Sequence, residues 1–186
     1  MKIGNQITES LRFHLDMDKK EARETAVALL RAVRIPEADK RFSSYPHEIL
    51  HNWWGNGVYV ARESGNWSEG LTAYLADHLF AEQKGAGSAY RQETLQKYAD
   101  YASRAKDFPL SEFRARHSPS TEAIGYGKAL MLFHMTRREL GDDVFVKGLR
   151  SLYESKKFQR ASFDDVRRGF ETASGRRVGY RIVDRR

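Results

Sequence analysis

Two histidines stand four residues apart in the stretch His47-Glu48-Ile49-Leu50-His51. On an α-helix, residues with this spacing lie one turn apart on the same face, so both imidazoles can direct a nitrogen toward one point. A zinc ion accepts that arrangement. Glu48 lies about 100° around the helix from His47, beside such an ion, where its carboxylate can take a proton from a water molecule that the ion activates. The spacing predicts a hydrolytic metal site.

A catalytic zinc site also needs a third protein ligand and an open fourth position. Glu69 is the candidate, because it starts a predicted helix that can run antiparallel to the first and bring its first turn back toward His47 and His51. The chain contains no cysteine, so any metal must be bound through nitrogen and oxygen atoms. We therefore predict a zinc site made of His47, His51 and Glu69.

A simpler interpretation of the same residues is an amphipathic helix that carries two histidines. A chance HExxH in a chain of this length is expected on the order of once in a few hundred proteins. A glutamate in the first turn of a helix, as Glu69 would be, is also common, because it interacts favourably with the helix dipole. Neither feature decides between the two interpretations alone.

Helical patterns cover most of the chain around these residues. Capping signals mark several helix starts, such as Asp18 with Glu21, Pro46, and Ser162 with Asp165, and glycines mark several ends. An alternating stretch, Leu11–Met17, predicts one short N-terminal strand. The pattern predicts a mainly α fold with seven helices, over about residues 22–33, 46–54, 68–83, 88–106 and 121–140, then around 145–153 and from Ser162 to Gly175.

The composition limits the partners. The chain has 186 residues, the size of one domain, and its 32 Lys and Arg against 25 Asp and Glu give a net charge of +7. The basic residues are spread along the chain and no nucleic-acid-binding motif accompanies them, so we expect no nucleic-acid binding.

No stretch approaches the ~18 apolar residues of a membrane span, and the N-terminus has no apolar signal region. We expect no membrane interaction and, for the sequence as written, a cytoplasmic protein.

Two longer stretches resemble a known zinc site. His47-Glu48-Ile49-Leu50-His51-Asn52-Trp53-Trp54-Gly55-Asn56, followed by Trp67-Ser68-Glu69-Gly70-Leu71-Thr72-Ala73-Tyr74, is similar to the zinc-binding region of the aminopeptidase N family of gluzincin metallopeptidases. The resemblance continues through Gly125-Tyr126-Gly127-Lys128 and covers about residues 42–175. It implies a helical domain like that of a gluzincin. We predict one domain over residues 1–186. It consists of an N-terminal segment 1–41, the zinc region 42–175 and a basic tail 176–186.

The resemblance also implies roles for single residues. His47, His51 and Glu69 would bind zinc, Glu48 would act as general base, and Tyr126 would donate a hydrogen bond to the oxyanion of the tetrahedral intermediate. The apolar stripe of its helix also suits Tyr126 to the core. The family's upstream β domain and its Gly-x-Met-Glu-Asn motif, which captures a free amino group, have no counterpart in the sequence. Exopeptidase specificity is therefore not implied.

Two functions follow as alternatives. The first is a zinc-dependent peptidase acting on peptide or protein substrates. The second is a truncated, catalytically weak zinc-binding domain that acts by association with another chain or with a second copy, which would cover the missing lobe. A glycyl-aminopeptidase type of gluzincin and a basic nucleic-acid-binding domain are further alternatives.

The remaining polar and aromatic residues receive structural roles. His78 lies on an apolar stripe and is expected to be a hydrogen-bonded core histidine. His117, in a predicted loop, is expected in solvent or beside a substrate cleft. The tryptophans Trp53, Trp54 and Trp67 are expected to pack the zinc helix against its neighbour.

Overall fold

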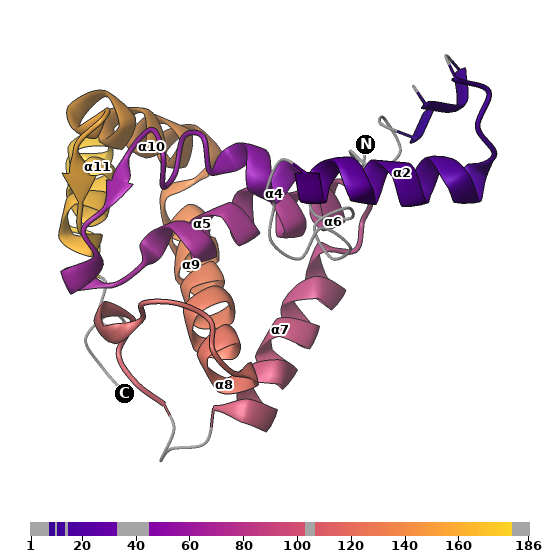
Figure 1. Ribbon diagram of the computed structural model, residues 1–186. Helices are drawn as coiled ribbons and strands as arrows, with labels where there is room; N and C mark the ends of the chain where they lie inside the picture. Colours follow the sequence, from indigo (N-terminus) through magenta and orange to yellow (C-terminus); the bar gives the residue numbers. More distant parts are fainter. Residues whose placement is uncertain (1–7, 10, 14, 33–44, 103–106, 180–186) are drawn as a thin grey trace. The chain divides into compact units, whose positions relative to one another are not determined.

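The computed structural model describes residues 8–9, 11–13, 15–32, 45–102 and 107–179. Contacts between Cα atoms divide the chain into two compact units, Met1–Ile49 and Leu50–Arg186. Figure 1 labels the main helices of each unit. The protein is mostly helical, as the sequence predicts, and each unit is described separately below.

The predicted N-terminal strand is wrong. Residues 8, 9, 11–13 and 15 are helical, and helix α2 (Lys19–Ala32) follows them. The alternating pattern is also compatible with a helix, because Leu11 and Leu15 are one helical turn apart. Phe13 and Leu15 are 83% and 60% exposed, so this segment does not bury one alternating face as a strand would. Asp18 caps α2 as predicted, its carboxylate accepting hydrogen bonds from the backbone of Lys20 and Glu21 at 2.7 and 2.9 Å.

The predicted helix from Pro46 is shorter than expected. Helix α4 (Tyr45–Leu50) ends one residue before His51, and residues 51–53 form turns. The backbone amides of Trp53 and Trp54 both donate to the carbonyl of Leu50, at 3.0 and 2.9 Å. His51 therefore lies in the turn that closes the helix and not inside the helix.

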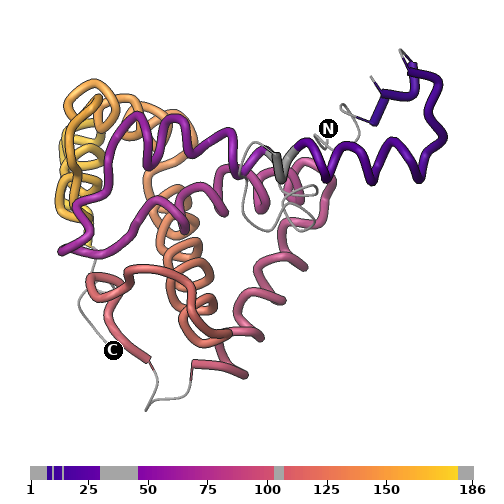
Figure 2. The backbone as a smooth tube through the Cα atoms, in the orientation of Figure 1, coloured from indigo at the N-terminus to yellow at the C-terminus, as the bar shows by residue number. Residues whose placement is uncertain are grey.

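A long helical segment from Trp67 to Gln83 confirms the third predicted helix. It consists of α5 (Trp67–Ala73), a π-helical part η2 (Tyr74–His78) and α6 (Leu79–Gln83). Figure 2 follows this segment as one continuous coil. Asn66 caps its start, where the side-chain oxygen accepts a hydrogen bond from the Ser68 amide at 3.3 Å.

The middle of the chain forms a second long helical segment, which packs against the first. After α7 (Gly87–Tyr101) and the short 3-10 turn η3 (Leu110–Glu112), the chain runs through α8 (Pro119–Glu122), the π-helical η4 (Ala123–Lys128) and α9 (Ala129–Leu140). Both α5 and α7 contact η4, and α5 also contacts α9. The predicted helix from Thr121 to Leu140 is thus present, with a π-helical part that the sequence did not predict.

The C-terminal helices α10 (Asp142–Lys156) and α11 (Phe163–Ser174) lie side by side (Figure 1). Their contact includes the stacked rings of Phe145 and Phe170, whose centroids are 5.0 Å apart. The predicted cap is present, since Ser162 and Asp165 form a reciprocal capping box. Gly175 ends α11 with φ 67°, as expected for a helix-terminating glycine.

A small parallel sheet joins two segments far apart in the sequence. Strand β1 (Tyr59–Val60), which precedes the 3-10 turn η1 (Arg62–Ser64), pairs with β2 (Arg160–Ala161) in the register Tyr59–Arg160. The indole of Trp67 donates a hydrogen bond to the carbonyl of Ala161 at 2.7 Å. The sheet thereby ties α10 and α11 to the start of α5.

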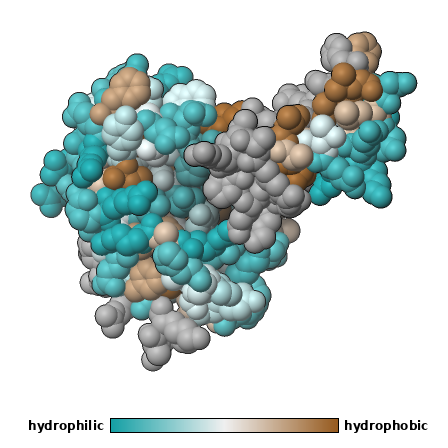
Figure 3. Space-filling view, viewed as in Figure 1, coloured by the Kyte–Doolittle hydropathy of each residue, from teal (hydrophilic) through white to brown (hydrophobic). Residues whose placement is uncertain are grey.

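The core of the second unit is formed by aromatic and aliphatic side chains of these helices and of the turn after α4, among them Trp54, Trp67, Leu71, Phe133, Phe145 and Phe170. The face visible in Figure 3 is mainly hydrophilic, with isolated apolar residues. None of the described helices has both the length and the apolar character needed to cross a membrane.

Candidate metal centre

The predicted ligands meet in one group. His47, His51 and Glu69 each offer a ligand atom, and these three atoms lie within 4.8 Å of one another. His47 is buried, whereas His51 and Glu69 are partly buried. Two imidazole nitrogens and a carboxylate oxygen at this spacing could bind a metal ion.

The turn after α4 fixes the orientation of the His51 ring. Nδ1 of His51 lies 2.9 Å from the carbonyl oxygen of Trp54. A carbonyl oxygen can only accept, so Nδ1 carries a hydrogen, and in the neutral ring Nε2 has the lone pair. Gly55 adopts φ 120°, a backbone conformation that residues with a Cβ rarely adopt, and lies against the same ring. The main chain thus presents Nε2 as the ligand atom, a common arrangement for metal-binding histidines.

Nε2 of His51 faces the carboxylate of Glu69, 3.5 Å from its Oε2. Two hydrogen-bond acceptors at this separation need a positive charge between them, either a proton or a cation. A tetrahedral zinc ion with ligands at about 2.0–2.1 Å holds neighbouring ligand atoms about 3.4 Å apart. The observed separation matches that geometry.

The start of α5 holds Glu69 in place. Glu69 lies in the first turn of the helix that Asn66 caps, and the Ser68 hydroxyl donates to the same Asn66 oxygen at 2.9 Å. Gly70, the next residue, packs so closely on α9 that an added Cβ would overlap the Cβ of Ala129. The carboxylate therefore projects from a helix that cannot move closer to α9.

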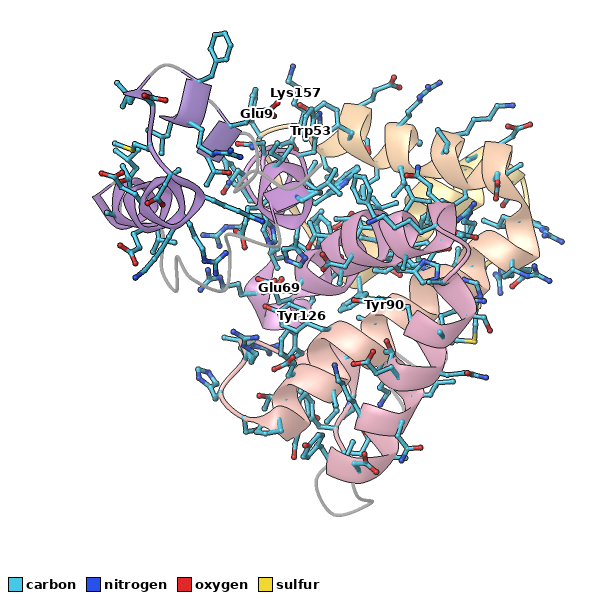
Figure 4. The ribbon with its side chains drawn as sticks, turned by 90° about the vertical axis from the view of Figure 1, so that its right-hand side faces the viewer. Glu9, Trp53, Glu69, Tyr90, Tyr126 and Lys157 are labelled. Carbon is cyan, nitrogen blue, oxygen red and sulfur yellow. The ribbon has the colours of Figure 1, made fainter. Side chains whose placement is uncertain are left out.

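Tyr126 lies on the neighbouring helical segment. It is a partly buried residue of η4, which contacts α5, and Figure 4 labels both Tyr126 and Glu69. The ring of Phe113 meets the Tyr126 ring edge to face at 6.1 Å, and the guanidinium carbon of Arg116 lies 6.0 Å from its centroid. The Tyr126 phenol thus belongs to an element that contacts the Glu69 helix, and its role as hydrogen-bond donor stays a prediction.

The other predicted residues have mixed outcomes. His78 is buried, as expected for a core histidine, and His117 is exposed in its loop. Trp54 and Trp67 pack edge to face at 6.3 Å in the core. Trp53 is 46% exposed, so its expected packing role is wrong. Of these two neighbouring tryptophans, Trp54 is buried and Trp53 is exposed.

The sequence did not predict a polar network among the helices. Nη1 of Arg91 lies 2.7 Å from Nε2 of His78, and because arginine can only donate, His78 is neutral with its hydrogen on Nδ1. That buried Nδ1 has no hydrogen-bond partner among the described residues.

Other polar contacts extend the network. Arg137 forms ion pairs with Glu82 at 2.8 Å and with Asp142 at 2.7 Å. The Tyr74 hydroxyl lies 3.4 Å from Nδ1 of His134.

Burial shifts the ionisation of this network. Burial, reinforced by the positive charge of Arg91, lowers the pKa of His134 to about 4. Burial also lowers the pKa of His78. Both rings therefore favour the neutral form in the folded protein. The only sequence signal for this network was the apolar stripe that carried His78.

Three known proteins illustrate how similar the sequence of this chain is to its relatives. The chain is 26% identical over 146 residues to aminopeptidase N of Lactococcus lactis, covering 71% of this chain and 17% of that protein. It is 26% identical over 140 residues to the mitochondrial aminopeptidase 2 of Saccharomyces cerevisiae, covering 71% of this chain and 15% of that protein. It is also 50% identical over 49 residues to the oligopeptide transport ATP-binding protein OppD of Escherichia coli, covering 26% of this chain and 14% of that protein. The chain thus spans a small fraction of the length of each relative.

The match to a family model is more extensive. The model of the peptidase family M1 domain matches residues 30–184, which include His47, Glu48, His51, Glu69 and Tyr126. This range is most of the chain and contains the whole metal-ligand group. The chain therefore belongs to peptidase family M1.

Proposed function

We propose that the protein is a zinc-dependent metallopeptidase that hydrolyses peptide bonds. The observation that carries this proposal is the group of His47, His51 and Glu69, whose ligand atoms lie within 4.8 Å of one another. Membership of peptidase family M1 and similarity to two aminopeptidases support it. A metal-ligand group alone would suit many hydrolases, and the family match narrows the reaction to peptide hydrolysis.

Zinc is the metal that these residues suit. Two imidazole nitrogens and one carboxylate oxygen are a common ligand set of catalytic zinc, which keeps its fourth position open. The hydrogen bond from Nδ1 of His51 to the Trp54 carbonyl, at 2.9 Å, leaves Nε2 as a ready ligand. A bound zinc ion supplies a Lewis acid that polarises a carbonyl and lowers the pKa of water.

The chain's own residues would perform the proton transfers. Glu48 would take a proton from the attacking water and deliver it to the nitrogen of the leaving amine, so that the peptide bond breaks without releasing an unstable amide anion. The Tyr126 hydroxyl would donate a hydrogen bond to the carbonyl oxygen as it gains negative charge in the transition state. The proposal is hydrolysis of peptide bonds, without a choice between terminal and internal bonds.

A pair of variants tests the site and the reaction separately. His47→Ala should lose zinc, measured by elemental analysis of protein purified without added metal. Glu48→Gln should keep zinc and lose hydrolysis of a mixed peptide library, followed by mass spectrometry, because the amide cannot accept the proton. An equal zinc content in wild type and His47→Ala would contradict the metal site.

The same assay addresses the alternative of a zinc-binding domain that acts by association. Zinc retained in wild type and Glu48→Gln, with no peptide cleaved by either, would reject the peptidase and favour a metal with a structural role. Sedimentation of that protein with and without zinc would then reveal whether copies of the chain associate.

A further inference from the structure

Phe113 packs its ring on the element that carries the proposed oxyanion donor. It directly follows the 3-10 turn η3 and is 1% exposed. A Cβ added to Gly125 would overlap three atoms of the Phe113 ring, so the ring lies directly on the backbone of η4. The same ring meets the next side chain of η4, that of Tyr126, edge to face with 6.1 Å between the ring centroids. Phe113 therefore contacts η4 at two successive residues.

The main chain of Phe113 is bound to the start of the helix that carries Glu69. Its carbonyl accepts a hydrogen bond from the backbone amide of Asn66 at 2.8 Å. Asn66 is the residue that caps α5, three positions before Glu69. The next carbonyl along the chain, that of Arg114, accepts from the Asn66 side chain at 3.3 Å. Phe113 thus joins the start of the Glu69 helix, through its main chain, to the Tyr126 element, through its ring.

A second contact brings the same two helical segments together. Gly70, the residue after Glu69, packs so closely on α9 that an added Cβ would overlap the Cβ of Ala129. Ala129 lies three residues, about one helical turn, after Tyr126. The backbone that carries Tyr126 is therefore close to the backbone that carries Glu69. The direction of the Tyr126 side chain then depends on the groups that touch its ring, and the buried Phe113 ring is one of them.

We propose that Phe113 is a positioning residue, which holds the Tyr126 phenol in the orientation in which its hydroxyl reaches the oxyanion. The inference rests on the proposed peptidase function, in which Tyr126 donates that hydrogen bond. An oxyanion donor acts at about 2.7–3.1 Å from the charged oxygen, and a misplacement of about 1 Å can cost about 10²-fold in rate. A close-packed neighbouring ring supplies this precision, because a gap beside Tyr126 would cost the contacts between the two rings.

Phe113→Leu removes the ring and keeps an apolar side chain. We expect kcat to fall by about 10- to 100-fold, because the Tyr126 hydroxyl is present but less well oriented. The zinc content should equal that of wild type, and KM should change less than about twofold. Kinetics with a peptide that the wild type cleaves, measured below the thermal midpoint, test this. An unchanged kcat in folded Phe113→Leu would overturn the proposal.

A double-mutant cycle with Tyr126→Phe separates orientation of the hydroxyl from a general loss of packing. Once the hydroxyl is absent, it can no longer be misplaced, so Phe113→Leu should change kcat less than about twofold in the Tyr126→Phe background. An equal loss of kcat in both backgrounds would overturn the positioning role and leave the peptidase function intact.

Phe170→Leu is the matched control. Phe170 is also 1% exposed, and its ring lies on Gly148 in the same manner, since a Cβ added to Gly148 would overlap it. Its helix α11 and the neighbouring α10 carry none of the candidate ligands or catalytic residues. The variant should lower the thermal midpoint and leave kcat unchanged. A loss of kcat as large as that in Phe113→Leu would overturn the proposal, because lost core packing would then explain both.

Gly125→Ala tests the same contact from the other side, should Phe113→Leu not fold. The added Cβ displaces the Phe113 ring, while alanine is a better helix former than glycine. We expect a similar fall in kcat that again disappears in the Tyr126→Phe background, and an unchanged kcat would overturn the proposal. Hydrolysis of no peptide by the zinc-loaded wild type would overturn the proposed function itself, and with it this inference.

Discussion

At the scale of single residues, the candidate centre depends on main-chain groups as much as on the ligands. The Trp54 carbonyl fixes the hydrogen of the His51 ring on Nδ1, and the Asn66 cap fixes the helix that carries Glu69. The spacing within one helical turn predicted that His47 and His51 act together, whereas Glu69 was supported by its helix start and by the resemblance to the aminopeptidase N family. The sequence could not predict the Trp54 contact, since that contact arises from the turn that closes α4 before His51.

Tyr126 allows a test that separates chemistry from packing. Tyr126→Phe removes the hydroxyl and keeps the ring that packs against Phe113 at 6.1 Å. We expect kcat to fall by about 10²–10³, the usual loss for one oxyanion donor, with zinc content and thermal midpoint unchanged. Peptide kinetics and elemental analysis of the purified variant measure this. A variant with full activity would assign Tyr126 to the core alone.

At the scale of helices and strands, the sequence predicted what local signals determine. The caps at Asp18 and Ser162 and the stop at Gly175 are where they were expected, because each depends on residues within one turn. The pairing of Tyr59 with Arg160 was missed because it joins two-residue strands about a hundred positions apart, too short for a periodic pattern. The π-helical parts η2 and η4 were missed because they depend on packing between helices.

Close packing between α5 and α9 predicts a coupling of stability to metal binding. Gly70→Ala adds a Cβ that overlaps Ala129, so α5 must shift and move the neighbouring Glu69. We expect a loss of about 1–3 kcal/mol in the free energy of unfolding and weaker zinc binding. Urea unfolding of the metal-free protein and chelator competition measure the two effects. Gly179→Ala, with open space around the added Cβ, should change neither.

The helical polar network predicts sensitivity to acid. Burial lowers the pKa of His134 from 6.5 to about 4, so between these values the unfolded chain binds a proton that the folded chain does not. Stability is therefore lost as the pH falls from 6.5 toward 4. In His134→Gln, the urea midpoint should fall less steeply over this range than in wild type. Met135→Gln, the next residue along the chain and 46% exposed, changes no titratable group and should keep the wild-type slope.

At the scale of the whole molecule, the boundary between the two compact units, at Ile49 and Leu50, falls inside the match to the family M1 model. The family M1 match, residues 30–184, contains nearly all of the second unit. The chain should therefore keep its metal centre when most of the residues that precede α4 are removed.

Removal of residues 2–41 tests that independence. All three candidate ligands follow residue 46, and α4 begins at Tyr45, so the shortened chain keeps the whole group. The core of the second unit uses residues from Trp54 onward, which predicts that the shortened chain folds. We expect its zinc content and zinc affinity to equal those of the full chain, by elemental analysis and chelator competition, and the same truncation with His51→Ala to lose the metal. Loss of zinc from the shortened chain with intact ligands would instead show that the metal centre depends on residues 2–41.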